Sequence, residues 1–185
     1  STSVASNPSC TYNYPAVIED GNYTVYGHVF DSHGLASASN PQTADYTVNN
    51  VAPVASSIVV NGGSDITLTE STTTEVKVTG TITDNNSCQD ILSVLGEVYR
   101  ESITSLGCVF SPDDNNCYIQ PSCTVVTSGD TCDSNTDASA DYECTFDVEY
   151  HADPTDVDTE YPSETWYGFF SVGDFGSLDD QTESA

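Results

Sequence analysis

The segment between Cys132 and Cys144 carries the side chains that hard cations prefer. Its candidate oxygen ligands are Asp133, Asn135, Asp137 and Asp141. An EF-hand loop begins with the same alternation, but it requires glycine at its sixth position and glutamate at its twelfth. Those positions hold Ala138 and Cys144, so a true EF-hand is excluded. A looser oxygen cage for Ca²⁺ is one prediction for this loop, and a solvated acidic turn is the alternative.

A second acidic run, ADPTDVDTE, spans residues 152–160. Its candidate ligands are Asp153, Asp156, Asp158 and Glu160. In an extended chain the last three share one face, where their charges repel one another unless a cation neutralises them. The alternative is an exposed insert. Ca²⁺ is the ion expected in either segment, because acidic loops of this kind suit it better than Mg²⁺.

Cysteine is abundant, yet no two cysteines form a C-x-x-C pair and no histidine lies at zinc-finger spacing. This argues against a zinc site and favours disulfides formed in an oxidising compartment. The disulfide candidates are Cys88, Cys108, Cys117, Cys123, Cys132 and Cys144. Their connectivity stays open, and a bridge between Cys132 and Cys144 is one hypothesis. Cys10 is expected to be unpaired within the chain or bonded to another molecule.

The charge balance excludes several classes of partner. The chain has 29 acidic residues and only two basic ones, Lys77 and Arg100, for a net charge of −27. Nucleic acid and anionic membranes are therefore not expected as partners. No apolar run approaches the ~20 residues of a membrane span. The charge serves either solubility or cation binding, and composition does not separate the two.

Catalysis is not expected. The histidines are His28, His33 and His151, and none belongs to a recognisable hydrolase or metalloprotease motif. Each is most simply a surface or strand residue. We therefore predict that the chain is not an enzyme.

Apolar residues recur at every second position in three segments, 73–83, 141–151 and 165–174. The expected inner sets are Val76, Val78, Gly80 and Ile82; Tyr142, Cys144, Phe146, Val148 and Tyr150; and Trp166, Gly168, Phe170 and Val172. Such half-buried strands are typical of antiparallel sheets. The segment 88–101 fits both periods; a strand is favoured there, and a short helix is the alternative.

An internal repeat organises the chain. YTVYGHVFDSHG (23–34) aligns without gaps on WYGFFSVGDFGS (166–177), an offset of 143 residues. The first copy continues into a further strand and a linker at 44–55, whereas DDQTESA shows no such strand. We therefore predict that 1–52 is the C-terminal part of one unit. Residues 53–185 form a second unit with a cysteine-rich insert, whose closing strand is missing or donated by a neighbour.

The first copy resembles the last two strands of immunoglobulin-like repeats in large prokaryotic surface proteins, similar to PKD and cadherin-like modules. Asp31 and Gly34 supply D-x-x-G, and Asn50, Ala52 and Pro53 supply the N-x-A-P joint. The resemblance covers about 20–83 and 140–177, while the cysteine-rich segment 88–132 departs from it. It implies an all-β fold of tandem, disulfide-stapled Ig-like antiparallel β-sandwiches, with acidic loops of the kind that hold calcium between domains.

Together these features predict a secreted structural or adhesive protein at the cell surface. It would be a subunit or repeat segment of an array or filament, in contact with copies of itself or with neighbouring repeats. The alternative is an adhesin module that binds carbohydrate or a surface protein.

Overall fold

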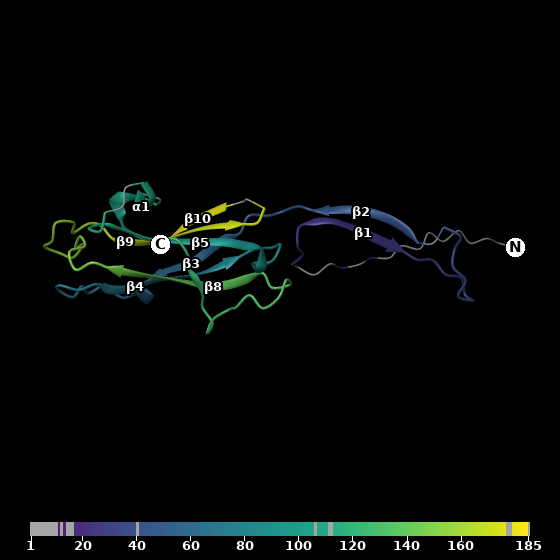
Figure 1. Cartoon of the computed structure of the whole chain (residues 1–185), viewed down its shortest axis with the longest axis horizontal. Helices are drawn as coiled ribbons and strands as arrows, with labels where there is room; N and C mark the ends of the chain where they lie inside the picture. The colour runs from purple at the N-terminus through teal and green to yellow at the C-terminus, as the bar shows by residue number, and fades with distance from the viewer. Residues whose placement is uncertain are drawn as a thin grey trace.

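The computed structural model describes residues 11, 13, 17–39, 41–105, 107–110, 113–176 and 179–184. It has a two-stranded sheet at one end and two four-stranded sheets at the other (Figure 1). The two-stranded sheet, here called the N-terminal hairpin, pairs β1 (Gly21–Gly27) with β2 (Gln42–Val48). Cys10 lies outside the described residues.

The two larger sheets are both antiparallel. The first has the order β3 (Val54–Val60), β4 (Thr74–Thr83), β8 (Ser139–Val148), β7 (Thr124–Val125). The second has the order β10 (Asp179–Glu183), β9 (Trp166–Asp174), β5 (Ile91–Arg100), β6 (Cys117–Gln120). Short helices are η1 (Asn61–Gly63), η2 (Cys88–Asp90), η3 (Glu101–Ile103) and α1 (Gly107–Phe110).

The three segments with period-two alternation form strands, as predicted. Val76, Val78, Gly80 and Ile82 of β4 are buried, as predicted, while the residues that alternate with them, Lys77, Thr79 and Thr81, are more exposed. The ambiguous segment forms β5, which confirms the strand interpretation; only the single turn of η2 precedes it. Tyr150, expected to face inward, is 49% exposed. That prediction is wrong because β8 ends at Val148 and the chain then turns.

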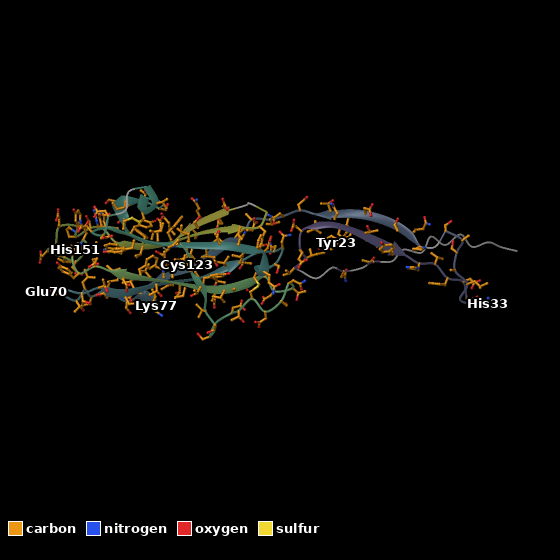
Figure 2. All side chains as sticks on the ribbon, viewed as in Figure 1. Tyr23, His33, Glu70, Lys77, Cys123 and His151 are labelled. Carbon is orange, nitrogen blue, oxygen red and sulfur yellow. A yellow bond between two sulfur atoms is a disulfide. The ribbon has the colours of Figure 1, made fainter. Side chains whose placement is uncertain are left out.

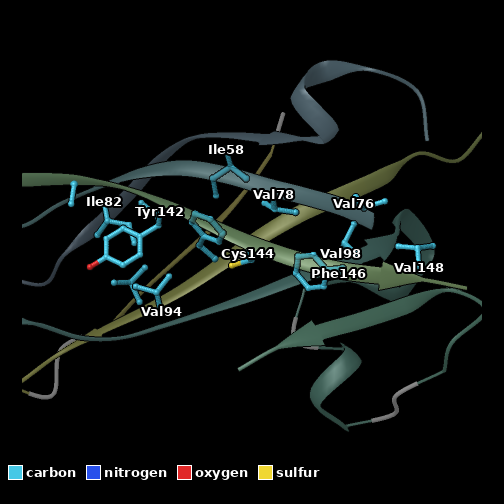
Figure 3. Close-up of a cluster of buried hydrophobic side chains, with 14 of the residues drawn as sticks. Ile58, Val76, Val78, Ile82, Val94, Val98, Tyr142, Cys144, Phe146 and Val148 are labelled. Atoms are coloured by element: carbon cyan, nitrogen blue, oxygen red, sulfur yellow. The ribbon is translucent and has the colours of Figure 1, made fainter. Parts of the chain in front are cut away.

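Both large sheets contribute to one core. Val78 and Phe146 from the first sheet pack with Val94 and Val98 from the second (Figure 3). A smaller cluster, which the sequence did not predict, comprises Tyr99, Cys108, Cys117 and Phe169. Phe169 alternates with the core-facing residues of β9, so β9 is buried on both faces near its start.

Three disulfides join the six predicted cysteines. The pairs are Cys88–Cys132, Cys108–Cys117 and Cys123–Cys144. The hypothesis of a Cys132–Cys144 bridge is therefore wrong. Cys144 points into the core, where Cys123 meets it, whereas Cys132 lies in a loop that packs beside Cys88.

The sequence does not predict a strand in DDQTESA, but residues 179–183 form β10. β10 pairs with β9, with Asp180 opposite Val172. The Asp180 carboxylate also accepts a hydrogen bond from the backbone N–H of Ala55 in β3, at 3.0 Å. The sequence DDQTE lacks apolar alternation. β10 pairs through its backbone at the edge of the sheet, and such pairing leaves no pattern of side chains in the sequence.

Gly96 of β5 provides a test of this packing. A Cβ atom at Gly96 would clash with Cys144 Sγ and lie only 3.1 Å from Cys123 Sγ. We expect Gly96→Ala to destabilise the sandwich by about 1–3 kcal/mol through overpacking, measured by thermal unfolding. Gly27→Ala is the matched control, because its Cβ would meet nothing closer than 3.8 Å. Equal unfolding temperatures for the two variants would contradict this packing.

Candidate metal centre

The N-terminal hairpin is attached to the rest of the structure through Asn86, in the loop between β4 and β5. Asn86 is 3% exposed. Its Oδ1 accepts a hydrogen bond from Val51 N at 2.7 Å, and its Nδ2 donates to Ile18 O at 3.2 Å and Asn49 O at 3.3 Å. One side chain therefore holds both the segment that enters β1 and the segment that leaves β2. We call this region the junction.

Three aspartates meet at the junction. Asp84 and Asp90 come from the β4–β5 loop, and Asp174 ends β9. One carboxylate oxygen of each lies within 4.8 Å of the other two, and no other group of this kind is found among the described residues. Asp84 is fully buried and Asp174 is 3% exposed. Since Ca²⁺ takes oxygens at about 2.3–2.6 Å, two of its ligands are up to about 5 Å apart, and this spacing fits. We call Asp84, Asp90 and Asp174 the aspartate triad.

Local hydrogen bonds fix the loop that carries two of the three aspartates. Asp84 Oδ1 accepts from Asn86 N at 2.7 Å, which closes an Asx turn. Ser87 Oγ caps η2 by accepting from Gln89 N at 3.1 Å. The disulfide from Cys88 to Cys132 anchors the middle of the loop. These interactions hold Asp84 and Asp90 in place from both ends.

Buried oxygens at the junction lack hydrogen-bond donors. Asp84 Oδ2, Asp90 Oδ2 and Asn50 Oδ1 have no hydrogen-bond partner among the described residues. Asn50 belongs to the linker after β2, and its Nδ2 donates to Asp174 Oδ2 at 2.8 Å. A buried acceptor left unsatisfied costs about 1–3 kcal/mol. A bound cation would satisfy such oxygens together.

The electrostatics favour the same conclusion. Burial raises the pKa of Asp84, and the nearby charges of Asp174 and Asp20 raise it further. Burial likewise raises the pKa of Asp90, with Asp84 and Asp174 adding to the effect. At an effective dielectric of about 20, each pair of charges 4–5 Å apart repels by roughly 3–4 kcal/mol. A divalent cation is the counter-charge that fits this triad.

The chain's own fixed cations are engaged elsewhere. Lys77 Nζ lies 2.7 Å from Glu143 Oε1 on the outer face of the first sheet. Arg100 pairs with Asp153, at 3.1 Å, and with Glu164, and its guanidinium stacks 3.7 Å from the centre of the Tyr161 ring. Neither Lys77 nor Arg100 therefore neutralises the triad.

A cavity on the hairpin side reaches one member of the triad, Asp90. This cavity, of about 280 Å³, is lined by Asp90, Asn86 and Ser87 together with Glu19 and Asp20, which precede β1. The two acids of the hairpin flank therefore face the same cavity as Asp90. An ion would enter through this opening.

The predicted ligands in the loop 131–144 form hydrogen bonds with other groups of the protein. Asp141 Oδ1 accepts from Thr81 Oγ1 at 2.7 Å and its Oδ2 from Asp130 N at 3.0 Å; these hydrogen bonds lower the pKa of Asp141. Asp137 Oδ2 accepts from Asp133 N at 3.3 Å. Asn135 instead reaches the hairpin flank, where its Nδ2 donates to Glu19 Oε1 at 3.0 Å. The structure does not gather these side chains into a cage.

The run 152–160 is also not gathered around one point. Asp153 is the partner of Arg100, while Asp156, Asp158 and Glu160 are exposed. Two of the histidines, His33 and His151, are far apart: His33 lies at the tip of the hairpin and His151 at the opposite end of the molecule (Figure 2).

Only partial signals for the aspartate triad are present in the sequence. Asp84 lies in TDNNSC, which fits an ordinary Asp/Asn turn, and Asp174 aligns with Asp31 in the repeat. Asp84 and Asp174 are 90 residues apart in sequence (174 − 84), so no local motif contains both. The useful signal would have been aspartate at both ends of 84–90 around Cys88.

The raised pKa values predict how acid affects the metal-free protein. Folded Asp84 and Asp90 bind protons more tightly than in the unfolded chain, so stability rises as pH falls through their folded pKa values. In metal-free buffer the unfolding temperature should therefore increase as the pH is lowered through the raised folded pKa values toward the usual aspartate pKa of about 3.9. Asp84→Asn should reduce this increase, and saturating Ca²⁺ should suppress it because protons and Ca²⁺ compete. Identical pH profiles for wild type and Asp84→Asn would contradict this interpretation.

None of the helices in the described part of the chain has the length and apolar character of a membrane span. Comparison with protein families, with curated proteins and with solved structures finds no match to this chain.

Proposed function

We propose that this chain is an extracellular structural or adhesive protein built from Ig-like β-units, with a junction stabilised by Ca²⁺. The sheet orders β3-β4-β8-β7 and β10-β9-β5-β6 support an Ig-like sandwich, in which a four-stranded sheet faces a sheet of three or more strands. Strand β1 aligns with β9 through the repeat, at the offset of 143 residues, and each pairs with the antiparallel strand that follows it, which supports tandem units.

The aspartate triad carries this proposal. It lies where the linker residue Asn50 donates a hydrogen bond to Asp174, and a bound cation would satisfy its buried oxygens. Ca²⁺ suits the site better than Mg²⁺, because Mg²⁺ retains water and demands near-octahedral geometry. An ion bound there would hold Asn50, and with it the hairpin, against Asp174. Its structural role would be to fix the angle between successive units.

The setting supports an extracellular location. Three disulfides form and persist in oxidising compartments. Extracellular calcium modules bind with Kd of about 10⁻⁴–10⁻³ M, a range that suits a site with three carboxylates and an amide.

The hairpin supports contact with neighbouring repeats. Tyr26 in β1 is 61% exposed, whereas Phe169, its counterpart in β9 at the offset of 143, is 1% exposed. An isolated two-stranded hairpin is at best marginally stable in water. The first unit therefore gains stability when further β-structure covers it, and an adjacent repeat or a second copy would supply that cover.

Small-angle X-ray scattering tests the proposed role of the ion. With Ca²⁺ the conformations of the wild-type chain should have a narrow range of maximum dimensions. In metal-free buffer this range should broaden, because the hairpin changes its orientation. Asp174→Asn should resemble the metal-free protein even with Ca²⁺. Asp156→Asn, which removes an exposed carboxylate far from the junction, should behave as wild type. Scattering that is unchanged by Ca²⁺ in every variant would refute the structural role.

A further inference from the structure

We propose that the cavity at the end of the sandwich opposite the hairpin binds a neutral sugar. The cavity has a volume of about 570 Å³. Small-molecule sites typically measure about 300–1,000 Å³. Its walls come from the segment 64–68 after β3, the segment 152–156 after β8, and the first residue of β9, Trp166. This site is separate from the aspartate triad, so the inference does not rest on cation binding.

The lining of the cavity has an apolar part and a polar rim. Ile66, Leu68 and Trp166 pack against the main core and contribute to the apolar part of the lining. Ser64, Asp65, Thr67, Thr155 and Asp156 supply hydroxyls and carboxylates. A sugar ring has the matching character, since its C–H face is apolar and its edge carries hydroxyl groups.

Trp166 is held in a fixed position. Its indole Nε1 donates to Asp153 O at 3.1 Å. Its ring packs against Tyr118, with ring centres 6.1 Å apart. Because its N–H is already satisfied, the indole offers the cavity an aromatic surface rather than a donor. A flat and rigid aromatic wall suits stacking against a sugar ring, since little side-chain entropy is lost on binding.

The charged residues of the cavity lining restrict the class of ligand that can bind. The lining contains Asp65, Asp153 and Asp156 and no lysine or arginine. The nearby cation, Arg100, is paired with Asp153 and Glu164. Anionic ligands would therefore be repelled. A wholly apolar ligand would strip water from the rim without replacing its hydrogen bonds. Hydroxyl groups of a neutral sugar can donate to the carboxylates, and such charge-assisted bonds are strong.

Fluorescence gives a direct test, because Trp166 is the chain's single tryptophan. The full chain is titrated with maltose, cellobiose, lactose and N,N′-diacetylchitobiose up to about 10 mM, above the Kd of 1 mM that corresponds to about −4 kcal/mol. At least one of these sugars should change the Trp166 emission saturably. A disaccharide that contains glucuronic acid should bind at least tenfold more weakly than its neutral counterpart.

Two variants of the same acidic run provide the matched comparison. Asp156→Asn removes a carboxylate from the rim and should weaken sugar binding at least fivefold. Asp158→Asn alters an exposed residue outside the lining and should leave binding unchanged. Asp158 has φ of 72°, a left-handed conformation that asparagine tolerates, so this control keeps the local backbone.

Three results would overturn the proposal. The first is the absence of a saturable change with any of the four sugars. The second is tighter binding of ethylamine than of every sugar, which would assign the acidic rim to a cationic ligand. The third is an emission change that follows protein concentration alone, which would assign the cavity to contact with a second copy.

Discussion

Removal of Ca²⁺ should lower the unfolding temperature of the wild-type chain by about 5–10 °C. A ligand at a hundredfold excess over its Kd stabilises the folded state by about 2.7 kcal/mol. For a chain of this size each kcal/mol shifts the unfolding temperature by about 2–4 °C. The physical source would be the aspartate triad, where a bound ion would relieve carboxylate repulsion and satisfy buried oxygens. Calorimetry with and without chelator measures the shift.

The controls separate specific binding from screening. With a net charge of −27, any salt stabilises the fold to some extent, so NaCl must match the ionic strength of CaCl₂. Asp174→Asn and Asp90→Asn should each lose most of the Ca²⁺-dependent shift, while Asp156→Asn should keep it. A shift of equal size in Asp174→Asn would place the stabilising ion elsewhere.

Loss of the Cys88–Cys132 disulfide is expected to have the other large effect. The bridge joins residues 44 apart. Loop-closure entropy for such a span predicts a loss of about 4 kcal/mol. Because Cys88 lies between Asp84 and Asp90, Cys88→Ser with Cys132→Ser should also free the loop and weaken Ca²⁺ binding about tenfold. Denaturant unfolding measures the first effect, and a Ca²⁺ titration measures the second.

The Cys108–Cys117 bridge is the matched control. It spans only 9 residues and packs against Tyr99 and Phe169, away from the triad. Its removal should cost about 2–3 kcal/mol by the same relation, with Ca²⁺ affinity unchanged. If both double variants weakened Ca²⁺ binding equally, the loss would reflect general destabilisation rather than release of the 84–90 loop.

Strands with one buried face could be predicted from the sequence. Val76 and Val78 alternate with Glu75 and Lys77, and burial follows that alternation in β4. Elements that depend on backbone pairing or on contacts with distant loops could not be predicted in this way. β10 has acidic residues and pairs through its backbone, and the buried Phe169 depends on a loop that covers it from outside.

The sequence predicts acidic segments that could bind a cation, but it does not predict the three aspartates that lie together in the structure. Acidity and oxidised cysteines pointed to a cation in an extracellular β-protein, and the loops richest in acid were the natural candidates. In the structure Asp141 is satisfied by Thr81 and Asp130, and Asp153 by Arg100. The triad depends on the pairing of β9 with β5, which brings Asp174 beside Ile91. Long-range pairing of this kind leaves no local spacing to detect.

Isothermal titration of Ca²⁺ into the metal-free chain, at an ionic strength of about 0.15 M to screen diffuse binding, tests the central claim most directly. We predict one specific ion per chain with a Kd of about 10⁻⁴–10⁻³ M, lost in Asp174→Asn and retained in Asp137→Asn. Binding that survives Asp174→Asn but disappears in Asp137→Asn, or no specific binding to the wild-type chain, would contradict the assignment of the aspartate triad as a calcium centre.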